Sequence, residues 1–292
     1  EGRVGPAGEL DCSVRGSIPL AAAGVFIDEL TDVSGTLSLN ASLGGTAGRP
    51  EPRGELGFRN LELTIPRTGQ RVHGLQGVVA VNDQTIELQG IQGRLDTGWF
   101  SLSGSVEHRF TRLGAARIEL ETASVPVRVP RTLEMLVSGN LTLTGLPEES
   151  LLEGQLVLLE GVFFRDLGLP DVAAALSRKK EGPLVPPLDA PYLRRVRLQV
   201  DVQGRDLFTV DNAAAYLLVS PDLTVAGTLQ RPLVNGRADI RSGTFMVRGN
   251  RFVVRTGVVD FIDPYAPVPT LDVESRTEIR RYTITLRVMG TP

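Results

Sequence analysis

Histidine and cysteine, the residues most often used for metal binding and nucleophilic chemistry, are scarce in this chain. The two histidines, His73 and His108, lie far apart, and neither has a companion His or Cys at the spacing of a metal site. Cys12 is the single cysteine, so an internal disulfide and an all-cysteine metal site are excluded within the chain. The sequence therefore predicts no metal site and no cofactor.

Carboxylates are plentiful, and the pair Asp260 and Asp263 has the residue types that glycoside hydrolysis needs, since glycosidases place two carboxylates several ångströms apart. These two residues flank Phe261 and Ile262 directly before Pro264, which is typical of a strand that ends in a turn. A Gly-x-Ser-x-Gly elbow and a phosphate-binding glycine loop are both absent from the sequence. We expect the chain not to be an enzyme.

The composition is that of a sheet. Apolar residues make up 41% of the 292 residues and aromatic residues only 5%, so aliphatic and β-branched side chains carry the burial. A formal net charge of -3 argues against nucleic-acid binding, which normally requires a basic field. No apolar run reaches the ~18 residues of a membrane-spanning helix, and residues 1–9 lack the features of a signal peptide. We interpret residues 1–292 as one elongated β segment of a longer protein.

A spacing repeat predicts how the strands are joined. The segments Gly45 to Gly54 and Gly227 to Gly236 share Gly-Thr-x-x-Arg-Pro, and Gly145 to Gly154 keeps the glycine spacing without the arginine. Seven residues further on, the second and third copies have another glycine, Gly161 and Gly243, before an apolar and aromatic stretch. Turn residues that recur at a fixed spacing are a signature of repetitive β architecture.

Alternation of apolar and polar residues predicts many strands with one buried and one exposed face. Leu37, Leu39, Ala41 and Leu43 alternate with polar residues, and Tyr282 to Val288 does the same near the end of the chain. Turn signals separate these runs at Asn82–Asp83, Gly44–Gly45 and Gly249–Asn250, spaced as in antiparallel hairpins. The predicted fold class is all-β, a long antiparallel meander.

One segment, residues 166–187, interrupts the strand pattern. Pro170 suits the first turn of a helix, an apolar face follows, and Gly182 with Pro183 would end the helix before a Pro-rich stretch. The segment is interpreted as a short helical and Pro-rich insertion. It would either cap one end of the sheet or, through its basic end, contact lipid headgroups or a partner.

The third copy of the repeat and the residues after it resemble the carboxy-terminal domain of the TamB family, within the larger AsmA-like group of bridge-type lipid carriers. Residues 223–290, together with Pro191 to Arg195 and the strand after it, cover about the last third of the chain closely, and the earlier copies are looser. The resemblance rests on these positions: Gly227, Thr228, Pro232, Gly236, Gly243, Gly257, Val259, Phe261, Asp263, Pro264, Pro269, Leu271 and the strand from Tyr282 to Gly290, with Pro191 to Arg195 and the strand after it.

The resemblance implies a β-taco, which is a curved, partly open sheet with an apolar concave side. It also implies a lipid transport segment between the inner and outer membranes, a role in outer-membrane assembly, and a periplasmic location with an inner-membrane anchor outside this segment. The implied partners are phospholipid and an outer-membrane β-barrel protein of the TamA type. The region that docks on that barrel is expected beyond residue 292.

The residues predicted to line the lipid groove share inward positions in the alternating runs. They are Leu61, Leu63, Val79, Val81, Leu141, Leu143, Leu156, Leu158, Val196, Leu198, Val200, Phe245, Val247, Ile284, Leu286 and Val288.

Two other interpretations stay open at this point. The same alternation would also fit a closed core, as in a structural β-solenoid or an interaction module. A polysaccharide-acting β-helix is more distant, because it would require clustered carboxylates beside aromatic platforms such as Trp99. An apolar stripe open to solvent would favour the lipid groove, and a filled interior would favour the structural module.

Overall fold

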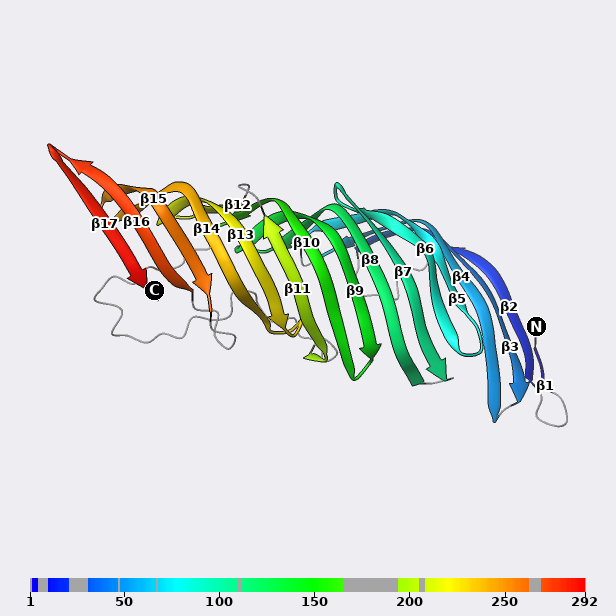
Figure 1. Ribbon diagram of the computed structural model, residues 1–292. Helices are drawn as coiled ribbons and strands as arrows, with labels where there is room; N and C mark the ends of the chain where they lie inside the picture. Colours follow the sequence, from blue (N-terminus) through cyan, green and yellow to red (C-terminus); the bar gives the residue numbers. More distant parts are fainter. Residues whose placement is uncertain are drawn as a thin grey trace. The chain divides into compact units, whose positions relative to one another are not determined.

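The fold is all-β, as the sequence predicts. The computed structural model describes residues 2–4, 10–20, 31–46, 48–66, 68–109, 112–164, 194–204, 208–262 and 269–291. Nearly all of these residues are in strands, and within each of the two units described below the strands form a mainly antiparallel, curved sheet (Figure 1). The helical and Pro-rich insertion predicted at residues 166–187 lies outside the described residues. Within the described part, no helix has the length and apolarity needed to cross a membrane.

The chain divides into two compact units. The first comprises Glu1–Pro126 with Asn140–Leu151, and the second comprises Val127–Gly139 with Leu152–Pro292. Three strands contribute residues to both units: β8 (Arg112–Val129), β9 (Leu133–Leu146) and β10 (Glu149–Phe163).

The first unit is an antiparallel meander in which each strand pairs with the next along the chain. Its strands are long because the alternating pattern continues over ten or more residues in most of them. They are β1 (Gly2–Val4), β2 (Leu10–Pro19), β3 (Thr31–Thr46), β4 (Arg49–Ile65), β5 (Gln70–Val81), β6 (Thr85–Leu95), β7 (Gly98–Arg109) and part of β8.

The spacing repeat proves to be a hairpin. Gly45 lies opposite Pro50 at the end of β3 and β4, and Gly227 lies opposite Pro232 in the second unit. Both glycines have φ +83°, a left-handed backbone conformation that glycine adopts at little cost. The sequence interpretation of Gly44–Gly45 as the turn is wrong by about two residues, because β3 continues through both glycines to Thr46. Gly44 and Gly45 are paired residues just before the end of β3, and the turn begins after Thr46.

The middle copy of the repeat is similar but not identical, since Gly145 has φ +116° where the other two glycines have +83°, and Ser150 stands at the position of their proline. A Cβ on Gly145 would lie 2.5 Å from the Glu149 carbonyl oxygen and 3.1 Å from Ser150 Cα, so Gly145 lies against the residue five positions further along. The first copy has Asn60 near the position where the others have their later glycine. Asn60 has φ +49°, and asparagine tolerates this region better than most residues.

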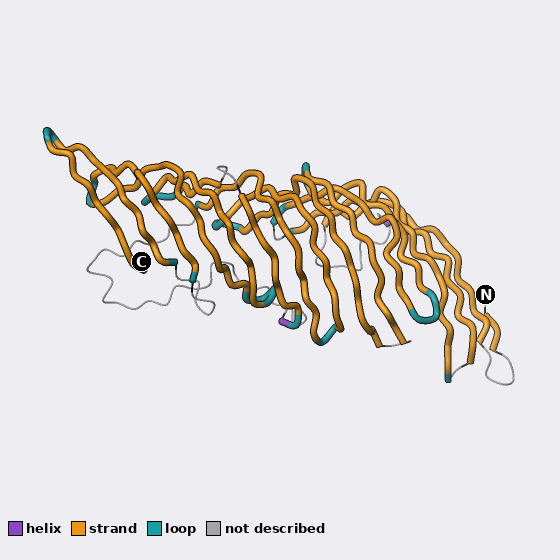
Figure 2. Tube along the Cα trace, viewed as in Figure 1, coloured by secondary structure: helices purple, strands orange, loops and turns teal. Residues whose placement is uncertain are grey.

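Register breaks bend the strands of the first unit. Asn60, Gly74 and Gly90 lie in three consecutive strands with φ of +49°, +61° and +57°. The pairing register shifts at each of these points. A β-bulge of this kind bends its strand and increases the local twist. Figure 2 shows the strand traces curving along their length.

The second unit is also antiparallel except at one place. It contains β11 (Val196–Gly204), β12 (Phe208–Asp211), β13 (Ala215–Gly227), β14 (Pro232–Val247), β15 (Asn250–Phe261), β16 (Thr270–Ile279) and β17 (Tyr282–Gly290). From β13 to β17 each strand pairs with the next. Strand β14 occupies one edge of β13, so β11 and β12 share the other edge, one after the other.

The exception is that β12 pairs with β10 in parallel, over Gly161–Phe163 and Phe208–Val210. Parallel neighbours cannot be joined by a tight hairpin and need a crossover of a dozen or more residues. The long connection between Phe163 and Val196 supplies that length. The predicted antiparallel meander, with its break at residues 166–187, did not include this one parallel pairing, which gives a physical reason for the break.

Candidate binding face

The pairing register gathers the apolar residues of the first unit on one face of the sheet. Leu39 lies opposite Leu56, Leu56 opposite Val79, and Val79 opposite Leu88, which makes a continuous apolar row across four strands. Directly paired residues project from the same side of a sheet, and residues two apart along a strand join them there. We call this side the apolar face of the first unit.

A similar row crosses the second unit. Val219 lies opposite Ile240, Ile240 opposite Gly257, Gly257 opposite Val273, and Val273 opposite Val288. A Cβ on Gly257 would lie 2.9 Å from Ile240 Cδ1, so the glycine leaves the space that the isoleucine side chain fills. The row defines an apolar face of the second unit by the same argument.

The opposite face of each unit is polar and carries ion pairs. Arg53 donates two hydrogen bonds to Asp83, both of 2.8 Å, and Arg287 donates two to Asp272, of 3.0 and 2.9 Å. These bonds lower the pKa of Asp272, because Arg287 donates to its charged form and attracts it electrostatically. All four side chains are well exposed, so the pairs contribute little to stability.

The apolar face keeps substantial contact with solvent. Leu39 and Leu56 are 40% and 37% exposed in the first unit, and Ile284 and Val288 are 40% and 37% exposed in the second. Side chains of this type in a closed core would be almost fully buried. At Leu39 and Leu56 in the first unit, and at Ile284 and Val288 in the second, the apolar face is therefore not covered by the rest of the described chain.

The sixteen residues predicted to line a groove fall into two classes of exposure. Leu158, Leu198 and Val200 are buried, and the other thirteen are half-buried or exposed. Where the register is given, each predicted residue lies on the apolar face of its unit. Whether they contact a lipid stays a prediction.

Part of the second unit is packed as a core. Val219, Ala238, Ile240, Val254 and Val273 form a buried cluster. Partly buried apolar side chains pack around it, namely Phe208, Val210, Leu217, Phe245, Val259 and Leu271. The apolar face is thus tightly packed along the middle of these strands and more open toward β17.

The residues considered for catalysis have structural partners. The ring nitrogens Nε2 of His73 and His108 lie 2.7 Å from the backbone oxygens of Asp96 and Asn82. Asp260 accepts two hydrogen bonds from Arg237, and Asp263 lies outside the described residues. Among the residues that the structure describes, no group of three or more His, Cys, Asp or Glu side chains could hold a metal ion.

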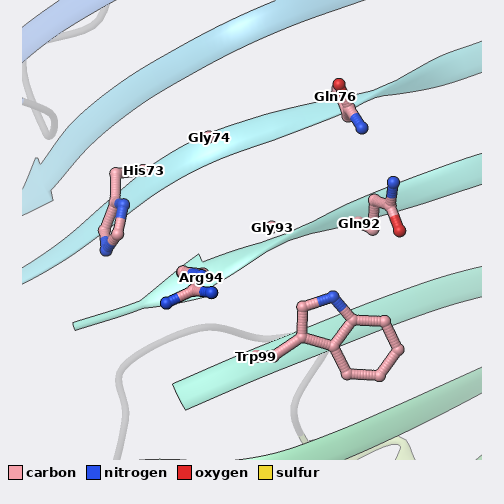
Figure 3. A pocket seen from close by; sticks show the side chains of 7 residues that line it. All are labelled: His73, Gly74, Gln76, Gln92, Gly93, Arg94 and Trp99. Carbon is pink, nitrogen blue, oxygen red and sulfur yellow. The ribbon is translucent and has the colours of Figure 1, made fainter. Parts of the chain in front are cut away.

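Two depressions of the first unit are lined mainly by residues of its polar face and of its turns. One, of about 380 Å³, lies around Trp99, and its lining side chains are shown in Figure 3. The other, of about 570 Å³, surrounds the turn at Asn82 and includes Arg53 and Asp83.

The sequence of the chain matches the model of a known protein family. The model of the TamB C-terminal domain matches residues 89–292, which is more than half of the chain. The chain belongs to the TamB family. The match begins within β6 and so extends well before the stretch that carries the resemblance in sequence. No curated protein matches the chain significantly.

Membership of the TamB family makes this a cell-envelope protein of the group that is associated with outer-membrane proteins and with bridge-type envelope assembly. The sheet with one apolar and one polar face is thus a property of a TamB-family segment.

Sequence reasoning missed two features of the first unit. The left-handed residues Asn60, Gly74 and Gly90, which bend the strands, were not singled out for that role, although an Asn or Gly inside a strand pattern is a known signal of a bulge. The polar depression at Trp99 also escaped notice, because its residues come from three strands and form no local motif.

Proposed function

We propose that this chain carries phospholipid acyl chains along the apolar faces of its sheet, between the inner and outer membranes. The observation that carries the proposal is the exposure of aliphatic side chains on the apolar face of each unit, Leu39 and Leu56 in the first and Ile284 and Val288 in the second. An exposed apolar stripe of this kind marks a surface that something apolar covers.

The energetics favour an acyl chain as the occupant. Each CH₂ group removed from water contributes about 0.8 kcal/mol, so a chain of about 16 carbons would gain on the order of ten kcal/mol. The aliphatic wall offers no strong polar contact, so the acyl chain can slide without crossing a deep energy well. The charged headgroup would stay at the solvent edge, outside the apolar stripe.

In this proposal the protein works in the periplasm without a cofactor and without covalent chemistry. An outer-membrane β-barrel protein of the TamA type would receive the lipid or organise its delivery. Family membership supports this setting, since the TamB family is associated in general with outer-membrane proteins.

The experiment is native mass spectrometry with lipid extraction on the chain purified from a bacterial envelope in mild detergent. Leu286→Arg places a charge on the apolar face, whereas Thr285→Arg places the same charge on the opposite side of the same strand. We expect co-purified phospholipid to be lost in Leu286→Arg and kept in Thr285→Arg. Equal lipid in both variants, or none in the unmodified chain, contradicts the proposal.

A second matched pair tests the first unit. Val79 and Val78 are adjacent, identical in type and both half-buried, but Val79 lies opposite Leu56 and Leu88 while Val78 lies opposite Gly57 and Gln89. Val79→Arg should reduce bound lipid and Val78→Arg should not. Circular dichroism spectra of both variants establish that the sheet is intact.

The second candidate is a structural module with a closed core. The buried cluster around Ile240 and Val254 favours it for the middle of the second unit. This candidate predicts a stable, lipid-free protein. Leu286→Arg and Thr285→Arg would then affect only its stability.

A further inference from the structure

A depression lies on the polar face of the first unit, on the side opposite its apolar face. Register places His73 opposite Arg94 and Arg94 opposite Trp99, while Gln76 lies opposite Gln92. These five residues come from β5, β6 and β7 and surround the depression of about 380 Å³ (Figure 3). Its volume is at the lower end of the range of about 300–1,000 Å³ found for small-molecule sites.

The polar side chains in this depression have free hydrogen-bonding capacity. Gln76, Gln92 and Arg94 are exposed, and none of them makes a hydrogen bond or an ion pair with the described residues. Elsewhere on the polar faces, Arg53, which lies on a neighbouring strand, is held by a carboxylate through two hydrogen bonds. Two amides and a guanidinium are therefore available to a ligand at one place.

Trp99 adds an apolar surface to this polar group. It is the single tryptophan of the chain and is 37% exposed. Its ring makes no stacking or cation–π contact with the described residues. In Figure 3 the indole lies on β7 beside Gln92 and Arg94, with Gly93 between these two on β6. Gly74 also lines the depression, and no atom lies within 4 Å of the position its Cβ would have.

We infer that this depression binds a saccharide chain. A sugar ring has apolar C–H groups that pack on an aromatic face and hydroxyls that bond to planar amides and guanidinium groups. The residues around Trp99 offer both kinds of contact within one open site. Arg94 is an unpaired cation there, so a saccharide that carries carboxylates should bind more tightly than a neutral one.

Other ligand classes fit the site less well. An acyl chain would leave the two glutamines and Arg94 without partners, which is unfavourable when they are covered. A nucleic acid requires several cations to neutralise phosphates, and the depression has one arginine in a chain of net charge -3. No carboxylate lines the depression, so the inference is one of binding and not of glycoside hydrolysis.

The test uses the fluorescence of Trp99, which reports on this site alone because the chain has no other tryptophan. The probes are chitohexaose, which is neutral, and hexagalacturonate, which carries carboxylates. We expect a saturable spectral change with both probes at millimolar concentration or below, and tighter binding of hexagalacturonate. No saturable change with either probe overturns the inference.

Variants measured by titration calorimetry locate the contact. Trp99→Ala should weaken binding of both probes about tenfold or more, the equivalent of about 1.4 kcal/mol. Arg94→Gln should weaken binding of hexagalacturonate only, to the affinity of chitohexaose. Tyr216→Ala removes another exposed aromatic side chain outside the depression and should change nothing. Unchanged binding in Trp99→Ala, or equal losses in Trp99→Ala and Tyr216→Ala, contradicts the inference.

Discussion

The ring of Phe245 on β14 stacks on the ring of Phe252 on β15, with ring centroids 5.9 Å apart and ring planes 17° apart. The two residues are cross-strand partners on the apolar face of the second unit. Phe252 is buried and Phe245 is half-buried and packs against the buried cluster, so the pair belongs to the packed part of this face.

Phe252→Ala should lower the free energy of unfolding by about 3 kcal/mol, because it removes a buried aromatic ring and leaves a cavity beside Phe245. The measurement is urea unfolding followed by circular dichroism. Val253→Ala is the control, since Val253 is the next residue, is exposed and points to the opposite side of β15. It should cost less than about 0.5 kcal/mol, and similar losses in the two variants would show that the stacked pair is not part of a packed core.

The hairpin glycines give a prediction about backbone conformation. Gly227→Ala should destabilise the protein by about 1–3 kcal/mol, because Gly227 has φ +83° and the new Cβ would lie 2.6 Å from the Arg231 carbonyl oxygen. Gly44→Ala should be neutral or slightly stabilising, since nothing lies within 4 Å of its Cβ position. Thermal unfolding of both variants checks this, and an undiminished melting temperature for Gly227→Ala would refute it.

The ion pair of Asp272 with Arg287 gives a prediction about pH. Arg287 lowers the pKa of Asp272 in the folded state, so the pair stabilises the fold above the ordinary carboxyl pKa of about 3.9 and this contribution is lost as the pH falls further. In Arg287→Gln the pKa of Asp272, measured by NMR titration, should rise toward its ordinary value. Salt should have a similar effect on the unmodified protein, because both side chains are exposed. If neither Arg287→Gln nor added salt changes the pKa of Asp272, the pair does not form in solution.

The alternating pattern was sufficient to predict the strands and which residues of one strand share a face. Alternation from Leu37 to Leu43 became part of β3, and alternation from Tyr282 to Val288 became β17. Such patterns are local, and a period of two leaves only the choice of face open. The repeat at Gly45 and Gly227 likewise predicted recurring strand connections, and both glycines close hairpins.

Features that depend on neighbouring strands could not be predicted in this way. The parallel pairing of β10 with β12 joins residues that are distant in sequence. The bulge at Asn60 reflects a mismatch of register with the next strand, which a single strand's pattern does not contain. The exposed fraction of a side chain also could not be predicted from the alternating pattern. Leu156 and Leu158 occupy equivalent positions in this pattern, but only Leu158 is buried.

The recurring hairpin has a consequence for how such a chain can change its reach. Each closed strand pair, such as those at Gly45 and Gly227, contacts mainly the strands directly beside it. Duplicating or deleting one pair would lengthen or shorten a sheet by two strand spacings, about 9.6 Å, while the apolar and polar sides keep their places. The hairpin is thus a unit of length. Related proteins could reach across gaps of different width by having different numbers of hairpins, with no change in the arrangement of apolar and polar residues within each strand.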